Sequence, residues 1–217
     1  MLKDFSKKFF QVFYFVPFTT VLPLLPYPAS FTSPEVILAT AIGIIFHLLA
    51  PYTPPKSFLD PHEQDRNSTW FLLISCLLVY EVSMVEFTYV FALSRKWPVM
   101  LGIGCLLALC GLSLRAWSTK TLGHFFTATI TLEENQPIIK DGPYKYLRHP
   151  AYLSSMISAA SIPFIFQSPW GLLLFVFVLI PSYLYRIHVE EDALISQFGE
   201  AYEKRAKETW RLIPLIY

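Results

Sequence analysis

The sequence of 217 residues has few charged residues and no large excess of either sign. Asp, Glu, Lys and Arg make up 15% of the chain, whereas a soluble globular domain has about 25%. This shortage argues against a disordered chain, a coiled coil and a typical soluble enzyme. The formal net charge of +1 gives no sign of the basic face that binds nucleic acid, so we expect no nucleic-acid partner.

Cysteine is also scarce. The three cysteines, Cys76, Cys105 and Cys110, all lie in apolar stretches. Because their number is odd and neither a Cys-x-x-Cys pair nor a histidine cluster accompanies them, the sequence argues against a disulfide framework and a zinc site. We interpret them as small residues of the core or of a lipid-facing surface, and we predict no metal site.

Apolar residues, by contrast, are abundant. They make up 54% of the chain, with 19 Phe, 12 Tyr and 5 Trp, and the mean hydropathy is +0.45. A helix that crosses a bilayer needs about 20 mostly apolar residues. The sequence therefore predicts an all-α, polytopic membrane protein with six transmembrane helices, or five as the alternative. The candidate spans are residues 9–29, 35–52, 70–93, 98–117, 151–167 and 170–186.

The first of these stretches is the weakest. Its four prolines would kink it or make it re-entrant; they are Pro17, Pro23, Pro26 and Pro28. A cleaved signal peptide is not expected, because the apolar run is too long and no small-residue cleavage site follows it. The connection 167–169 is too short to leave the membrane interface, so we expect the last two spans to form a C-terminal antiparallel helical hairpin.

The positions of Lys and Arg predict the orientation. With six spans and the N-terminus inside, all of the 17 Lys and Arg residues except Arg95 and Lys96 lie inside. The positive-inside rule then places both termini in the cytosol. The polar segments 118–150 and 188–211 lie on the same side, where we expect chemistry to occur. We divide the chain into an N-terminal transmembrane region, 1–117, and a C-terminal region, 118–217, with the last two spans and a cytosolic tail.

Two carboxylates, Glu81 and Glu86, lie in the middle of a predicted span, where a charged group is costly and is a functional candidate by default. The alternative is structural: protonation, or a hydrogen bond to another helix, for example to His47. We favour the structural interpretation.

Gly102-Ile103-Gly104 lacks the third glycine of a dinucleotide-binding fingerprint and lies inside a span. Together with Ala108 and Gly111, Gly102 and Gly104 are more typical of a helix-packing face.

The segment 140–152 is the most informative of the chain. Gly142-Pro143 predicts a tight turn, and Pro150 predicts the first turn of the next helix. Arg148 and His149 would then lie at a helix N-terminus, where backbone N–H groups favour anionic ligand groups. A basic anchor at the membrane interface is the equally weighted alternative.

A second polar segment follows the last span. Arg186 and Glu190 are four residues apart, so they share one face of a helix at the membrane boundary. A surface ion pair is one interpretation, although Arg before Glu is the weaker order for such a pair. A site for a charged substrate and cofactor is the other.

Together the two segments resemble the isoprenylcysteine carboxyl methyltransferase family. The matching pattern is Gly142-x-Tyr144-x-x-x-Arg148-His149-Pro150-x-Tyr152, followed by Arg186-x-x-x-Glu190-Glu191-x-x-Leu194, Phe198-Gly199-x-x-Tyr202 and Arg211-Leu212-Ile213-Pro214. It covers about the last 100 residues. The resemblance implies methyl transfer from S-adenosylmethionine to the C-terminal prenylcysteine carboxylate of CaaX-processed proteins, with the cofactor in a cytosolic pocket.

The resemblance also implies roles for individual residues. Arg186 would meet the substrate carboxylate. The cofactor-binding residues would be Gln136, Pro137, Ile138 and Ile139, largely through their backbone, and Tyr144, His149, Pro150, Ala151, Tyr152 and Glu190. The partners would be prenylated CaaX proteins or small prenylcysteine compounds and membrane lipid, and the location would be the endoplasmic reticulum of a eukaryotic cell.

The residue types suit this chemistry. A C-terminal carboxylate, with an ordinary pKa of about 3.5, is already ionised and needs desolvation and alignment rather than a general base. The planar guanidinium of Arg186 can hold a carboxylate in one geometry. Aromatic faces such as those of Tyr144 or Tyr152 can contact a sulfonium cation.

Two alternatives stay open. A related membrane methyltransferase could act on a small lipophilic thiol, acid or amine lipid; a thiol or amine would need a deprotonating group near Arg186, for which His188 is the nearby candidate. A non-catalytic transporter or scaffold would instead use Glu81, Glu86 and His47, with Arg148 and Arg186 as interface anchors.

Overall fold

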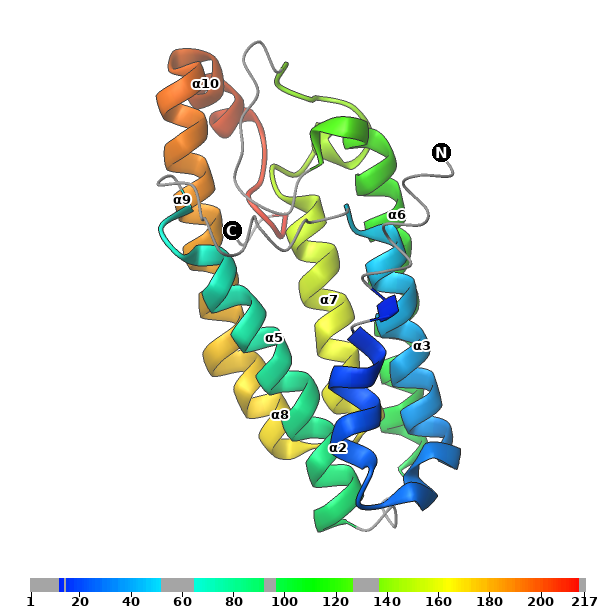
Figure 1. The fold of residues 1–217 in the computed structure, drawn as a ribbon. Helices are drawn as coiled ribbons and strands as arrows, with labels where there is room; N and C mark the ends of the chain where they lie inside the picture. Colours follow the sequence, from blue (N-terminus) through cyan, green and yellow to red (C-terminus); the bar gives the residue numbers. More distant parts are fainter. Residues whose placement is uncertain (1–11, 14, 52–64, 92–96, 127–136, 215–217) are drawn as a thin grey trace.

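The computed structural model of the chain describes residues 12–13, 15–51, 65–91, 97–126 and 137–214. Within these ranges the chain is helical, and its one β-type contact is an isolated bridge between Leu147 and Trp210. In Figure 1, α7 stands in the middle of the bundle, with α3 and α6 on one side and α5 and α8 on the other, while α9 and α10 extend beyond one end. The all-α prediction is confirmed for the described residues.

Three of the described helices are long and apolar enough to cross a membrane. The first is α5 (Ser68–Val85), continued by η4 (Glu86–Val90). The second is α6 (Pro98–Leu122), and the third joins α8 (Pro169–Leu174), η7 (Phe175–Leu179) and α9 (Ile180–Phe198). Two shorter apolar helices, α3 (Pro34–Leu49) and α7 (Pro150–Ile165), have 16 residues each, or about 24 Å. Five predicted spans therefore coincide with apolar helices; the number of crossings stays a prediction.

The proline-rich first stretch forms short helical pieces. They are η1 (Pro17–Val21), α2 (Leu22–Leu24) and η2 (Pro28–Thr32). Thr20 fixes the first piece against its neighbours, since its hydroxyl lies 3.3 Å from that of Thr40 and 3.4 Å from that of Tyr80. Leu24 is completely buried. The stretch therefore packs into the bundle, although its prolines divide it into short pieces.

Small residues allow α6 and α7 to pack closely. A Cβ atom at Gly104 would lie 3.0 Å from the backbone nitrogen of Ile165, and one at Gly111 would lie 2.7 Å from that of Ser158. Ala108, which lies between Gly104 and Gly111 in the sequence, is also buried. The predicted packing face is thus confirmed for these three residues. It is wrong for Gly102, which is exposed and where a Cβ atom would have no neighbour within 4 Å among the described residues.

Glu86 has the structural role that we favoured, but with a different partner. One carboxylate oxygen accepts hydrogen bonds from the Ser168 hydroxyl and from the Trp170 backbone N–H at 3.2 Å. It therefore caps α8 at its N-terminus, while His47 lies 2.8 Å through Nδ1 from the Gly43 carbonyl oxygen of its own helix. The cap holds the short turn between α7 and α8, which confirms the antiparallel hairpin.

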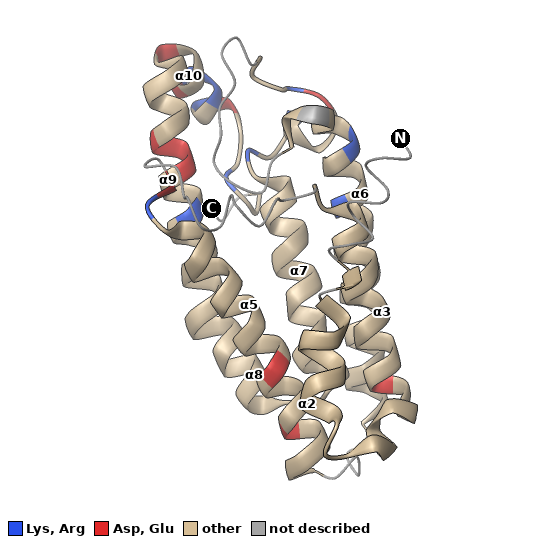
Figure 2. Cartoon of the chain, viewed as in Figure 1, with Lys and Arg blue, Asp and Glu red and all other residues tan. Residues whose placement is uncertain are grey.

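Charge is unevenly distributed along the bundle. Figure 2 shows the Lys and Arg residues gathered at the end that contains α10, the far part of α9 and the start of α7. This is the end that the positive-inside rule predicts to be cytosolic. The cysteines fit their predicted environments: Cys76 is half-buried, and Cys105 and Cys110 are exposed on the apolar bundle.

Candidate active site

The predicted turn before α7 is built on Gly142. Its φ of +52° is unfavourable for a residue with a side chain, and a Cβ atom would lie 2.5 Å from the Thr121 hydroxyl oxygen and 3.0 Å from the Trp117 indole nitrogen. The turn continues as η6 (Gly142–Lys145), and α7 begins at Pro150 with His149 as its N-cap. Both sequence predictions for this segment are confirmed, and the turn is seated against α6.

The chain beyond α10 (Glu200–Glu208) returns to this segment. Trp210 donates its backbone N–H to the Tyr146 carbonyl at 3.0 Å, and its own carbonyl accepts from the Arg148 N–H at 2.8 Å. The Arg211 carbonyl accepts from the His149 N–H at 3.1 Å. The two polar segments that the sequence separates are therefore joined through their backbones.

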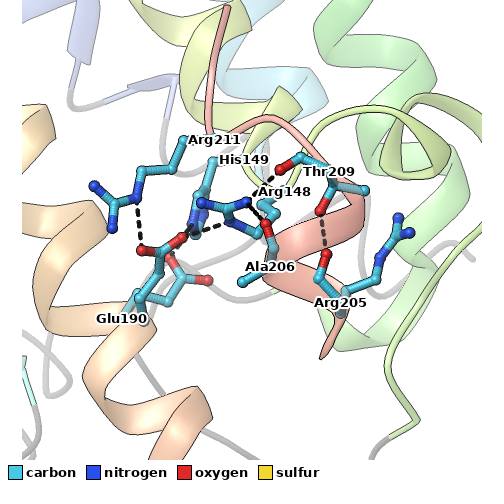
Figure 3. A network of polar contacts seen from close by, with 8 residues as sticks. Arg148, His149, Glu190, Arg205, Ala206, Thr209 and Arg211 are labelled. Carbon is cyan, nitrogen blue, oxygen red and sulfur yellow. Dashed lines mark hydrogen bonds and ion pairs between the residues drawn. The ribbon is translucent and has the colours of Figure 1, made fainter. Parts of the chain in front are cut away.

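Glu191 is the centre of this junction. One carboxylate oxygen accepts from Arg148 Nε at 2.8 Å and lies 3.2 Å from His149 Nε2, and the other accepts from Arg211 Nε at 2.7 Å. Figure 3 shows the neighbours Arg148 and His149 on one side and Arg211, from the segment beyond α10, on another. The Glu191 side chain is 8% exposed. Arg148 also donates to the carbonyls of residues 206 and 209, so it is an internal link and the interface-anchor interpretation is wrong for it.

The neighbouring Glu190 is placed differently. Its side chain is 27% exposed and approaches His149 Nδ1 at 3.9 Å. Its oxygen Oε2 is buried and has no hydrogen-bond partner among the described residues, and the same holds for the hydroxyls of Tyr144 and Tyr202. Electrostatic interactions link Glu190 to Tyr144, Tyr152 and Tyr202. The structure therefore brings together four predicted cofactor-binding residues, namely Tyr144, His149, Tyr152 and Glu190.

The two partnerless phenols are neutral. Burial, with the Glu190 carboxylate nearby, raises the pKa of Tyr144 far above its ordinary value of 10. Burial and the carboxylates of Glu191 and Glu190 do the same for the pKa of Tyr202. Both hydroxyl groups therefore keep a proton that they can donate to a ligand.

The start of α7 forms one wall of the site. The rings of His149 and Tyr152 are stacked, with centroids 5.6 Å apart and planes 13° apart. Pro150 and Ala151 are buried in the same helical turn. Upstream, Pro137 is exposed while Ile138 and Ile139 are half-buried in a segment without regular secondary structure. Gln136 lies outside the described residues.

Arg186 is buried, with 2% of its surface exposed, so it does not form a surface ion pair. Its Nη1 donates to the Asp65 carboxylate and to the hydroxyls of Ser68 at 2.9 Å and Thr69 at 2.5 Å. Its Nε donates to the Tyr152 hydroxyl at 3.1 Å. The guanidinium thus connects α9 to the start of α5 and to the wall formed by α7.

Asp65 was missed in the sequence, where it falls in a polar stretch before the third predicted span. Its carboxylate caps α5 by accepting from the Thr69 backbone N–H at 3.1 Å. Burial by itself would raise the pKa of Asp65, but Arg186 and the hydrogen bonds from the start of α5 lower it below its ordinary value of 3.8. The turn that follows has positive φ at Arg66, 44°, and Asn67, 61°.

Arg115 was also missed, since the sequence interpretation used it only as a positive charge. It lies on α6, is 7% exposed, and donates through Nη1 to the Ser155 hydroxyl at 3.0 Å and the Ala151 carbonyl at 3.4 Å. The available signal was an arginine in an otherwise apolar helix, which is a functional candidate by default.

Comparisons with known proteins show what the chain resembles. The model of the isoprenylcysteine carboxyl methyltransferase (ICMT) family matches residues 102–196. The chain is 27% identical over 178 residues to the protein-S-isoprenylcysteine O-methyltransferase of Saccharomyces cerevisiae, a match that covers 79% of this chain and 74% of that protein. It is 29% identical over 164 residues to the protein of the same name from Dictyostelium discoideum, with coverage of 75% and 66%.

The fold has a counterpart among solved structures. The structure of the eukaryotic intramembrane Ras methyltransferase ICMT without a monobody superimposes with a TM-score of 0.60 at 20% sequence identity, covering 93% of this chain and 74% of that one. This likeness concerns the fold and supports an integral membrane protein. The sequence matches confirm the resemblance: over residues 102–196 the chain is similar to the isoprenylcysteine carboxyl methyltransferase family.

Proposed function

We propose that the chain transfers a methyl group from S-adenosylmethionine to the C-terminal carboxylate of prenylcysteine, on CaaX-processed proteins or on small prenylcysteine compounds. The relatives that carry the name protein-S-isoprenylcysteine O-methyltransferase support this proposal. The geometry of the site supports it independently.

The observation that carries the proposal is the group of partnerless polar atoms around Glu190. Glu190 Oε2 and the hydroxyls of Tyr144 and Tyr202 are buried without hydrogen bonds to any residue that the structure describes. A buried polar group left without a partner costs about 1–3 kcal/mol. A polar ligand that supplied the missing partners would recover this free energy, so the arrangement suits a small molecule with several hydrogen-bonding groups.

S-adenosylmethionine fits these residues by chemistry. The Glu190 carboxylate can accept from hydroxyl and amino groups, and the neutral phenols of Tyr144 and Tyr202 can donate to acceptors. When bound, S-adenosylmethionine supplies an electrophilic methyl group. The stacked rings of His149 and Tyr152 would line the site beside it.

Arg186 is proposed to hold the substrate carboxylate. The hydrogen bond from Arg186 to the Tyr152 hydroxyl lies beside the proposed cofactor residues. The Arg186 guanidinium would then bind both the Asp65 carboxylate and the substrate carboxylate. An ionised carboxylate reacts as a nucleophile without losing a proton, so alignment by Arg186 is the main requirement. A buried arginine that already makes an ion pair is also well oriented, because its partners fix the plane of the guanidinium.

The prenyl chain would lie along apolar residues next to Tyr152. Tyr152 packs against a cluster formed by Val79, Leu179 and Tyr183, together with Met156. These residues come from α5, α7 and the helix that continues into α9.

The alternative acceptors are less well served by the structure. A thiol or amine needs a base, but the His188 side chain is 69% exposed and lies 3.9 Å from Asp192, whereas Arg186 is buried. The transporter interpretation used Glu81, Glu86 and His47; of these, Glu86 caps α8 and His47 contacts the Gly43 carbonyl of its own helix. We further propose that the basic end faces the cytosol, with both termini there, in the endoplasmic reticulum membrane of a eukaryotic cell.

The test is methyl transfer by the detergent-solubilised chain from labelled S-adenosylmethionine to acetyl-farnesylcysteine. Acetyl-geranylgeranylcysteine, the farnesylcysteine amide and unprenylated acetylcysteine serve as parallel acceptors. We expect label in the two prenylated acids and none in the amide or the unprenylated compound. Labelling of the amide, or no labelling of either prenylated acid, would contradict the proposed reaction.

A further inference from the structure

Glu81 is an acidic residue within a membrane helix, and the proposed function does not use it. It lies on α5, in the candidate span from Ser68 to Val90. It follows Ser68 by 13 positions and precedes Val90 by nine, which corresponds to about 20 Å and about 14 Å along the helix. A carboxyl group at this depth is costly in hydrocarbon and is a functional candidate by default.

α5 has a packed side and an open side, and Glu81 lies on the open one. Val79 and Ser83, two positions before and after Glu81, point to the opposite side of the helix and are at most 1% exposed. The positions 11, 7, 4 and 3 before Glu81 and 4 after it share its face. We call this face the α5 stripe: Glu81 at its centre and five residues that are each at least 36% exposed, namely Trp70, Ile74, Leu77, Leu78 and Val85.

Within the described ranges the Glu81 carboxyl group forms no hydrogen bond and no ion pair. Glu86 on the same span provides a contrast, since it accepts hydrogen bonds from the start of α8. The neighbours of Glu81 one turn away on the stripe are the apolar residues Leu77, Leu78 and Val85. Lipid tails offer no hydrogen-bond donor either. A donor for Glu81 therefore has to come from outside these ranges.

A second copy of the chain supplies a donor at the right depth. Two copies inserted with the same orientation are related by a twofold axis along the membrane normal, so each residue lies at the same depth in both. Two α5 stripes that pack face to face therefore bring Glu81 of one copy opposite Glu81 of the other. A protonated carboxyl group both donates and accepts, so two carboxyl groups that share at least one proton satisfy each other.

We propose that the chain forms a dimer in the membrane through the α5 stripe, with the two Glu81 carboxyl groups hydrogen-bonded at its centre. The apolar residues of the stripe supply van der Waals contacts, and the carboxyl pair fixes the register. A basic partner at this depth is not offered by the second copy, since Figure 2 shows the described Lys and Arg residues near α10, away from the middle of α5. Each copy keeps its own candidate active site, because Val79, which lies in the cluster that Tyr152 packs against, is on the opposite side of α5.

The test measures association of the full chain in phosphatidylcholine vesicles. Resonance energy transfer between donor-labelled and acceptor-labelled populations is followed as lipid dilutes the protein. Glu81→Ala removes the carboxyl group, Glu81→Gln replaces it with an amide that also donates and accepts, and Glu81→Lys reverses its charge. Leu106→Ala is the matched control, because Leu106 is 61% exposed on α6 and its truncation shortens an open side chain on another membrane helix.

We expect the wild type, Glu81→Gln and Leu106→Ala to associate alike. Glu81→Ala should associate about 5- to 30-fold more weakly, the effect of a lost polar contact between membrane helices. Glu81→Lys should not associate with itself, because two cations would face each other in a medium of low dielectric constant. A mixture of Glu81→Lys with the wild type should regain energy transfer through a Lys–Glu pair, and this recovery requires position 81 to face position 81.

Three results would overturn the inference. They are a wild type whose energy transfer falls to the level of random mixing on dilution, a folded Glu81→Ala variant that associates like the wild type, and a Glu81→Lys mixture without recovery. Circular dichroism in the same vesicles reports the folding of each variant. If neither Glu81→Ala nor Glu81→Lys folds, Glu81 stabilises the single chain and the inference is likewise overturned. None of these results depends on methyl transfer, so the dimer and the proposed function are tested separately.

Discussion

The Arg186 guanidinium is paired with the Asp65 carboxylate, which lies 121 positions earlier in the chain. Both side chains are almost completely buried, and Asp65 also caps α5. The proposed substrate-binding arginine is therefore oriented by a residue from another helix.

The first prediction concerns this pair. Asp65→Asn should lower the free energy of unfolding by about 3–5 kcal/mol, because it leaves the buried Arg186 charge uncompensated. Denaturant unfolding in mixed micelles measures the loss. The double variant Asp65→Asn/Arg186→Gln should lose less than the sum of the single variants, and additive losses would contradict the coupling.

The pH dependence of stability should follow from the same residue. The pKa of Asp65 is lower in the folded chain than its ordinary value of 3.8, so near and below that pH the unfolded chain binds a proton more readily than the folded one. The stability that Asp65 contributes is complete above its unfolded pKa and is lost as the pH falls through the folded pKa. The wild type should therefore lose its advantage over Asp65→Asn as the pH falls below about 4. A constant difference between the two from pH 6 to 3 would contradict this.

Arg186→Lys should reduce turnover with acetyl-farnesylcysteine by at least about tenfold, the effect of about 1.4 kcal/mol of lost alignment. Lysine keeps the charge, but its ammonium cannot reproduce the planar contacts with Tyr152 and Asp65. Binding of S-adenosylhomocysteine should survive. Near-normal turnover would leave Arg186 without a role in substrate alignment.

Glu190→Gln should weaken S-adenosylhomocysteine binding by about 1.5–3 kcal/mol, because a neutral amide replaces a charged acceptor. Its fold should be retained, since the Oε2 atom has no hydrogen bond to lose among the described ranges. Glu203→Gln is the matched control, because Glu203 is exposed on α10. Equal affinities in the two variants would remove Glu190 from the site.

Glu191→Gln should act mainly on folding. Its carboxylate joins Arg148, His149 and Arg211, so we expect the free energy of unfolding to fall by about 3 kcal/mol or more, as when one partner of a buried ion pair is removed. Unfolding in mixed micelles measures this, with Glu203→Gln again as the control. A stable Glu191→Gln variant with weakened ligand binding would reverse the roles assigned to the two adjacent carboxylates.

The sequence predicted those features of the fold that depend on neighbouring residues alone, such as turns and helix starts. Gly142-Pro143 marked a turn because only glycine accepts both its positive φ and its contact with Thr121. Pro150 marked the start of α7, and the short 167–169 connection marked the hairpin. The family pattern grouped Tyr144, His149, Tyr152 and Glu190 into one site, and the fold places them together.

Partnerships between distant segments could not be predicted in the same way. Asp65 lies in a polar stretch that reads as a connector, and nothing near it indicates Arg186. Glu190 and Glu191 are identical and adjacent, and only the positions of Arg148 and Arg211 decide which of them is enclosed by cations. His47 was only an example of a partner for Glu81 or Glu86, because a single sequence does not indicate that Ser168 lies opposite Glu86.

The position of Arg211 has a consequence for the order in which the protein is made. Glu191 is paired with Arg148, which precedes α7, and with Arg211, which follows α10. During synthesis every membrane helix of the described ranges emerges from the ribosome before residues 209–211 do. The backbone hydrogen bond to His149 and the ion pair between Arg211 and Glu191 therefore form last. The nascent chain can enter the membrane before its candidate active site exists.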